Sequence, residues 1–188
     1  FDMLLLVGLG NPTPNSQNNR HNIGFKIVDA INQKFGLSKQ KPKFKGLLTT
    51  GNIGDKKIYA IKPLTFMNNS GICIRELLEY FKIDAEDVIV FHDDLDIEFG
   101  KIKAKFGGSS AGHNGIASID KFIGKEYSRV RIGIGKPENK ISVSDFVLAD
   151  FSEDEQVHLD SITSNIIESL SFLIDKKLDL FSSTVNNN

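Results

Sequence analysis

Residues able to do acid–base chemistry collect where short apolar runs of the sequence end. His21 follows a loop rich in Gly, Pro, Asn and Ser, and Asp93 follows the apolar run 88–91. A His–Asp pair can hold one imidazole tautomer and stabilise the imidazolium during proton transfer. Asn11 and Asn114 lie in two glycine-containing segments, where their carboxamides could donate hydrogen bonds to a developing oxyanion. Such a set suits hydrolysis of an ester by water.

The acidic segment 93–96 permits other interpretations. Asp93, Asp94 and Asp96 are either solvated carboxylates of a turn or oxygen ligands of the kind that Mg²⁺ prefers. Asp93 is expected to orient a histidine because it lies nearest the end of the strand. His21 taken alone could equally be a structural histidine.

Several other chemistries lack their residues. The segment 8–13 resembles the start of a dinucleotide-binding loop, but Thr13 occupies the third glycine position and Pro12 has no N–H for a phosphate. No two histidines have zinc-ligand spacing. The single cysteine, Cys73, lies in an apolar stretch, which predicts a buried thiol.

The elements that position these residues alternate between strands and helices. Apolar or alternating runs predict strands at 3–8, 44–52, 56–62, 88–91, 101–106 and 130–134. Helical spacing predicts helices at 23–35, 74–81 and 116–123, and a capping box at 152–155 starts another whose apolar stripe reaches residue 174. For the second of these helices, Asn68, Asn69 or Ser70 could be the N-cap, and Asn114 could cap the third. The pattern predicts an α/β fold with a mixed, mostly parallel central sheet wrapped by helices, and polar residues beyond the carboxyl ends of its strands.

Length and charge narrow the class of protein. A chain of 188 residues predicts a single domain, here residues 3–184, with residues 1–2 left over from cloning and a frayed tail at 185–188. No run approaches the length of a membrane span, and one cysteine suits the reducing cytoplasm. The net charge of −1 argues against a strongly cationic nucleic-acid binder. Lysines at 39–45 and 101–105 form either local patches or the charged edges of a sheet.

Six segments, in order, resemble the bacterial-type peptidyl-tRNA hydrolase family. They are VGLGNP at 7–12, RHNIGF at 20–25, PLTFMN at 63–68 followed by SG at 70–71, HDDLD at 92–96, GHNG at 112–115 and RIGIGKP at 131–137. The resemblance implies hydrolysis of the ester between a peptide and the 3′ adenosine of tRNA, which recycles tRNA from stalled translation. It also implies a monomer without a metal or organic cofactor.

The resemblance assigns roles residue by residue. His21 takes the position of the catalytic histidine, Asp93 that of its carboxylate partner, and Asn11 that of the asparagine that distinguishes a blocked from a free α-amino group. The positions expected to contact the substrate, including the acceptor stem and 3′ CCA end of the tRNA, are Phe66, Met67, Asn68, Asn114, Lys105 and Arg131. The last two match a basic pair associated with the tRNA 5′-phosphate.

The sequence also departs from the family pattern. Ser16 stands where a tyrosine usually helps to wall the tRNA 3′ end, Thr13 replaces a glycine, and Asn19 replaces a threonine. The loop 109–111 lacks the usual glycine and histidine. Losing an aromatic surface weakens base stacking by about 1–3 kcal/mol, so affinity is affected before activity. The main alternative function is a non-catalytic RNA-binding relative of the kind that serves in intron splicing.

Overall fold

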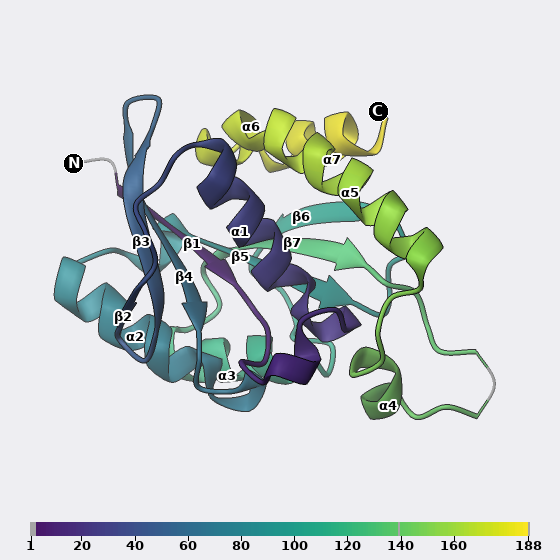
Figure 1. Cartoon of the computed structure of the whole chain (residues 1–188). Coiled ribbons are helices and arrows are strands. Elements are labelled where there is room, and N and C mark those ends of the chain that lie inside the picture. Colours follow the sequence, from purple (N-terminus) through teal and green to yellow (C-terminus); the bar gives the residue numbers. More distant parts are fainter. Residues whose placement is uncertain (1–2, 139, 188) are drawn as a thin grey trace.

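A seven-stranded mixed sheet runs through the centre of the protein, with the order β2-β3-β4-β1-β5-β7-β6 (Figure 1). The computed structural model describes residues 3–138 and 140–187, so residues 1–2 and 188, expected as a cloning remnant and as part of the tail, lie outside it. The neighbouring strands β4, β1, β5 and β7 are parallel, and β3 and β6 run against them. The strands are β1 (Met3–Gly8), β2 (Lys41–Lys43), β3 (Gly46–Ile53), β4 (Lys56–Pro63), β5 (Val88–Asp94), β6 (Ile102–Phe106) and β7 (Ser128–Gly133).

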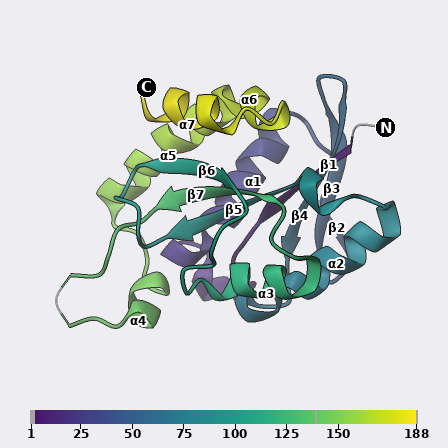
Figure 2. The ribbon, with the colours of Figure 1, turned by 180° about the vertical axis from the view of Figure 1, so that it is seen from behind.

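Helices cover both faces of the sheet. One face carries α1 (Ile23–Lys34), α5 (Glu153–Glu168), α6 (Leu170–Ile174) and α7 (Leu178–Asn186) (Figure 1). The other carries α2 (Ser70–Phe81) and α3 (Asn114–Ile123) (Figure 2). The short α4 (Val143–Val147) stands apart from both layers, beyond the strand ends. Single 3₁₀ turns occur at Pro14–Ser16, Arg20–Asn22, Met67–Asn69 and Ala85–Asp87.

Strand β1 shows how the sequence builds two cores. Successive side chains of a strand point to opposite faces. Leu4 and Leu6 therefore pack with α1 and the C-terminal helices, whereas Leu5 and Val7 pack with α2 and α3. Cys73 lies in the second core, and burial raises the pKa of its thiol to about 12, which confirms the predicted buried thiol. The predicted α/β fold with a mixed sheet is confirmed.

The C-terminal region differs from its prediction. The capping box of Ser152 and Glu155 is present, but the helix it starts ends at Glu168, and the apolar stripe continues in the separate helix α6. In the tail predicted to fray from residue 185, α7 continues as far as Asn186, and Val185 is buried in the core. Fraying of the tail stays a prediction.

Helix α7 lies along the outer edge of β6. Ser182 Oγ accepts a hydrogen bond from Ala104 N at 2.9 Å. Asn186 accepts from Ile102 N at 3.0 Å and donates to Ile102 O at 2.7 Å. Side chains of α7 thus form hydrogen bonds with backbone groups of β6 that an edge strand would otherwise expose. At the opposite edge, β2 carries the exposed Lys41 and Lys43, as expected for lysines at a sheet edge.

No helix in the described ranges combines the length and the apolar character that crossing a membrane requires.

Candidate active site

A cavity of about 590 Å³ opens beyond the carboxyl ends of β1 and β5. This is the edge at which an open α/β sheet binds its ligands. Eight of the residues predicted for the site line the cavity: Asn11, Ser16, His21, Phe66, Met67, Asn68, Asp93 and Asn114. Lys105 and Arg131, which were predicted to bind tRNA, are not in its lining.

Two glycines bring the segment that carries His21 against the sheet. A Cβ on Gly24, in the first turn of α1, would lie 2.3 Å from Phe91 O of β5. A Cβ on Gly8 would lie 2.3 Å from Gly24 O. Only glycine permits such close contact between backbones. The start of α1 therefore sits directly on the strand ends, and His21, just before the helix, reaches the end of β5.

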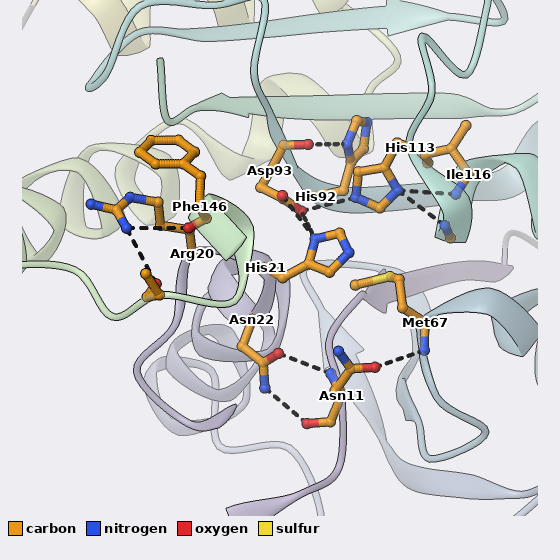
Figure 3. Close-up of polar contacts among 12 residues, drawn as sticks. Asn11, Arg20, His21, Asn22, Met67, His92, Asp93, His113, Ile116 and Phe146 are labelled. Atoms are coloured by element: carbon orange, nitrogen blue, oxygen red, sulfur yellow. Dashed lines mark hydrogen bonds and ion pairs between the residues drawn. The ribbon is translucent and has the colours of Figure 1, made fainter. Parts of the chain in front are cut away.

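Asp93 binds two histidines at once (Figure 3). His21 Nδ1 lies 2.9 Å from Asp93 Oδ2 and 3.0 Å from Oδ1. His113 Nε2 lies 2.9 Å from Asp93 Oδ1. The two imidazole centroids are 4.9 Å apart. The structure thus brings together the predicted His21–Asp93 pair and adds a second histidine to the same carboxylate.

The hydrogen bonds define the proton positions around Asp93. His113 caps α3, because its Nδ1 accepts from Gly115 N at 3.1 Å and Ile116 N at 3.2 Å. Its Nε2 must then carry the ring proton, and this N–H donates a hydrogen bond to Asp93. Burial opposes ionisation of Asp93, but electrostatic attraction to His113 and hydrogen bonds from His113 and His21 outweigh burial, so the pKa of this carboxyl stays well below its usual range. An ionised Asp93 accepts Nδ1–H of His21, which leaves the Nε2 lone pair for a substrate.

A third histidine lies behind this group. His92 is buried, and its Nδ1 lies 2.7 Å from the carbonyl oxygen of Asp93. Its ring packs edge-on against His113 at 4.9 Å. Burial, followed by the electrostatic influence of His113, lowers the pKa of His92 to about 3. His92 is therefore neutral at physiological pH and supports the backbone that carries Asp93.

Hydrogen bonds fix both the backbone and the side chain of Asn11. Its backbone N–H donates to Asn22 Oδ1 and its carbonyl accepts from Asn22 Nδ2, both at 2.9 Å (Figure 3). Its side-chain Oδ1 accepts from Met67 N at 2.8 Å. Because Oδ1 is occupied in this way, the side-chain NH2 group of Asn11 points toward the cavity, where it can donate a hydrogen bond.

The segment after β4 presents the other predicted contact residues. Phe66 adopts φ 64° and ψ 156°, a conformation that is strained for an aromatic residue. In this conformation Phe66 is 53% exposed at the cavity, and Met67 is buried. Asn68 and Asn114 are exposed in the cavity lining, whereas Ser16 is buried and bonded to the Thr13 hydroxyl. Asn69 occupies the N-cap position of α2 without a side-chain capping bond, and His113, not Asn114, caps α3.

Arg20 ties α4 to the histidine segment. Its Nη1 donates to Phe146 O at 3.2 Å and to Ala149 O at 3.3 Å, and its Nη2 lies 3.3 Å from Glu155 Oε1. The guanidinium also lies 4.2 Å from the Phe146 ring centroid (Figure 3). Val143, Val147 and Leu148 of this region form one wall of the cavity. One arginine, adjacent to His21 in sequence, therefore fixes that wall.

The predicted basic pair lies beside the cavity, on the edge strand β6 and its neighbour β7. Lys105 is exposed on β6, where it faces Arg129 in the register, and Arg131 on β7 faces Lys103. Lys105 and Arg131 thus share one face of the sheet as diagonal neighbours. Arg131 Nη1 lies 3.8 Å from Asp94 Oδ2, a separation at which the ion pair is weak.

Metal binding has one geometric candidate near the cavity. The ligand atoms of His21, Asp93 and His113 lie within 4.8 Å of one another. The nitrogens that face Asp93 carry the protons of its hydrogen bonds, which a metal would have to displace. Asp94 and Asp96, the other expected magnesium ligands, turn to Arg131 and Lys136 instead. Within the described residues they form no ligand group with Asp93, so the geometry disfavours the magnesium interpretation.

Sequence reasoning missed four residues of the site: His113, Asn22, Arg20 and His92. His113 carried a signal, since a histidine between a glycine-rich loop and a helix can cap the helix and face the site. Arg20 and Asn22 flank His21. Arg20 makes contacts more than a hundred residues away, whereas Asn22 binds Asn11, eleven residues before it. The signal for the burial of His92 was its place directly after the apolar run 88–91.

The comparisons agree with this geometry. A family model described as peptidyl-tRNA hydrolase matches residues 5–188. The peptidyl-tRNA hydrolase of Pelagibacter ubique is 82% identical over 185 residues, which cover 98% of this chain and 100% of that protein. That of Ehrlichia canis is 44% identical over 97% of this chain and 94% of its own length. A crystal structure of peptidyl-tRNA hydrolase from Acinetobacter baumannii superposes with a TM-score of 0.91 at 34% identity, covering 98% of this chain and 94% of that one. The chain belongs to the peptidyl-tRNA hydrolase family.

Proposed function

We propose that this protein hydrolyses the ester between a peptide and the 3′ end of tRNA, with His21 as the general base. The observation that carries the proposal is the hydrogen bond between His21 Nδ1 and the buried carboxylate of Asp93. It fixes the tautomer in which Nε2 can take a proton from water. Water then attacks the ester carbonyl, and the imidazolium that forms is stabilised by the ionised Asp93.

Carboxamides supply the second component of the mechanism. Asn11 is oriented by Met67 N so that its amide group donates into the cavity, and Asn68 and Asn114 line the same space. Donors already held in place stabilise the negative charge that develops on the carbonyl oxygen. We assign to Asn11 the contact with the first peptide bond, which a free aminoacyl group lacks. Phe66 offers a ring at the cavity for the terminal adenosine.

The tRNA partner requires a surface outside the cavity. Lys105 and Arg131 provide two cations on one face of β6 and β7, and we assign them to a phosphate of the tRNA acceptor stem. We further propose that the protein acts as a monomer in the cytoplasm, without a metal or organic cofactor. The retained His21, Asp93 and Asn11 disfavour a purely RNA-binding role, because binding alone does not need a base oriented by a carboxylate.

The deciding experiment compares two substrates with purified protein. N-acetyl-aminoacyl-tRNA should be cleaved, and free aminoacyl-tRNA should not. His21→Ala should lower kcat by about 10²–10⁴-fold, the usual contribution of a general base, while circular dichroism shows an intact fold. Activity should persist in EDTA. Near-normal activity of a folded His21→Ala protein, or loss of activity in EDTA, would refute the mechanism.

A further inference from the structure

A second cavity, of about 530 Å³, lies next to the first. It is bounded by the N-terminal half of α1, the segment after Asn11 and the ends of β3 and β4. Asn11 and Thr13 line both cavities, so the two meet along this short segment. The proposed chemistry around Asp93 uses only the first cavity.

We infer, on the basis of the proposed function, that the second cavity binds the peptide portion of the substrate, beyond the residue that carries the ester. A peptidyl-tRNA has two arms that leave the ester in different directions. The basic pair assigned to tRNA lies on β6 and β7, on one side of β1 and β5 in the strand order. The second cavity lies on the other side, toward β4 and β3. With the nucleotide arm directed to β7, the peptide arm passes over Asn11 toward β4.

The lining of the second cavity suits a polypeptide of varied sequence. Gln17 and Asn18 offer carboxamides that can bind a peptide backbone, and Phe25, Leu47 and Leu64 offer apolar surface. A nascent peptide has a constant backbone and changing side chains, so a binding site for it must rely on features of this kind.

The cations of the second cavity already have acceptors. Lys62 Nζ lies 2.7 Å from Asp29 Oδ1, and Lys26 Nζ donates to Gln156 Oε1 at 2.7 Å. Burial also lowers the pKa of Lys26, although nearby Asp160 and Asp150 oppose this shift. A phosphate site needs cations that can turn to the phosphate. A nucleotide strand is therefore a poorer fit than a peptide.

The size of the second cavity sets the expected reach. A compact space of this volume is about 8 Å across, which corresponds to about two extended residues. Binding should improve as the peptide grows from one residue to about three and should then level off. Asn11, held to Asn22 by two hydrogen bonds, forms the fixed boundary over which the peptide passes.

The test measures KM for N-acetylated substrates that carry one, two, three or five residues on the same tRNA. We expect KM to fall about two- to tenfold between one and three residues, the usual net effect of one hydrogen bond, and to change little between three and five. A KM independent of length would overturn the inference while leaving the proposed function intact. No cleavage of any blocked substrate would instead refute the proposed function.

Two variants assign the length effect to the second cavity. Leu47→Trp fills the cavity from β3, and the ratio of KM between one and three residues should fall to about one. Asn52→Trp places the same side chain on the exposed end of β3, outside both cavities, and should keep the wild-type ratio. An unchanged ratio in Leu47→Trp would contradict the inference. Weakened binding of deacylated tRNA by Leu47→Trp would favour a nucleotide in this cavity and would equally overturn it.

Discussion

His113 Nε2 lies 2.9 Å from Asp93 Oδ1 and donates a hydrogen bond to the carboxylate that also orients His21. Asp93 therefore accepts hydrogen bonds from two imidazoles. In Asp93→Asn the side-chain NH2 group would face at least one imidazole N–H, and two donors cannot form a hydrogen bond. Asp93→Asn should lower kcat by about 10²–10⁴-fold with little change in tRNA affinity. Single-turnover rates and tRNA binding should be measured together. Asp94→Asn is the matched control. A larger loss of rate in Asp94→Asn than in Asp93→Asn would show that Asp94, and not Asp93, orients the histidine.

Arg20 should act through the position of α4. A lysine in place of Arg20 keeps the charge. Its ammonium group cannot hydrogen-bond to Phe146 O, Ala149 O and Glu155 and also stack on the Phe146 ring, as the planar guanidinium does. Arg20→Lys should lower kcat/KM about tenfold, mainly through KM, and should speed tryptic cleavage after Lys140, in the segment leading to α4. Mass spectrometry of a digestion time course locates the cuts. Unchanged cleavage together with unchanged kinetics would exclude this role.

Lys105 and Arg131 should contribute to tRNA binding through charge alone. The double alanine variant should weaken binding and reduce the slope of log K against log salt by roughly two units, because each phosphate contact releases counterions. Cleavage of a peptide attached to a short 3′ fragment should be nearly unchanged. Lys41→Ala with Lys43→Ala, on the opposite edge strand, removes the same charge and serves as the control. Equal slopes in the two double variants would show that Arg131 is only a structural partner of Asp94.

Acid should destabilise the fold through His92. Its pKa is lowered from 6.5 to about 3 in the folded protein. Between these values the unfolded chain binds a proton that the folded chain does not, so the free energy of unfolding falls as the pH falls through this window. His92 should contribute up to about 1.4 kcal/mol per pH unit. Urea unfolding of wild type and His92→Asn from pH 7 to pH 4 measures this, and parallel curves would contradict the assignment.

Local patterns were sufficient for much of the fold. The apolar run at 3–8, the alternation at 101–106 and the capping box at Ser152 correspond to β1, β6 and the start of α5. Each depends on neighbours within a few residues, which the sequence displays directly. The His21–Asp93 pair was predictable because Asp93 lies at the carboxyl end of β5 and His21 follows the loop after β1, and these strand ends meet at one edge of the sheet.

The remaining features depend on contacts between distant segments. The apolar stripe through 162–174 continues across Ser169, so periodicity does not reveal the break between α5 and α6. Asn114 is a plausible cap by type, but the fold gives that position to His113, whose other nitrogen reaches Asp93. The role of Arg20 depends on Phe146 and Glu155, more than a hundred residues away.

The contact between α7 and β6 bears on how the protein behaves at high concentration. An uncovered outer strand can recruit a strand from a second molecule and so begin ordered aggregation. Here Ser182 and Asn186 occupy the amides of Ala104 and Ile102, so a second molecule finds these hydrogen-bonding positions taken. Two small polar side chains in the last helix thus keep the sheet from growing beyond the molecule, and colloidal stability depends on a region that takes no part in catalysis.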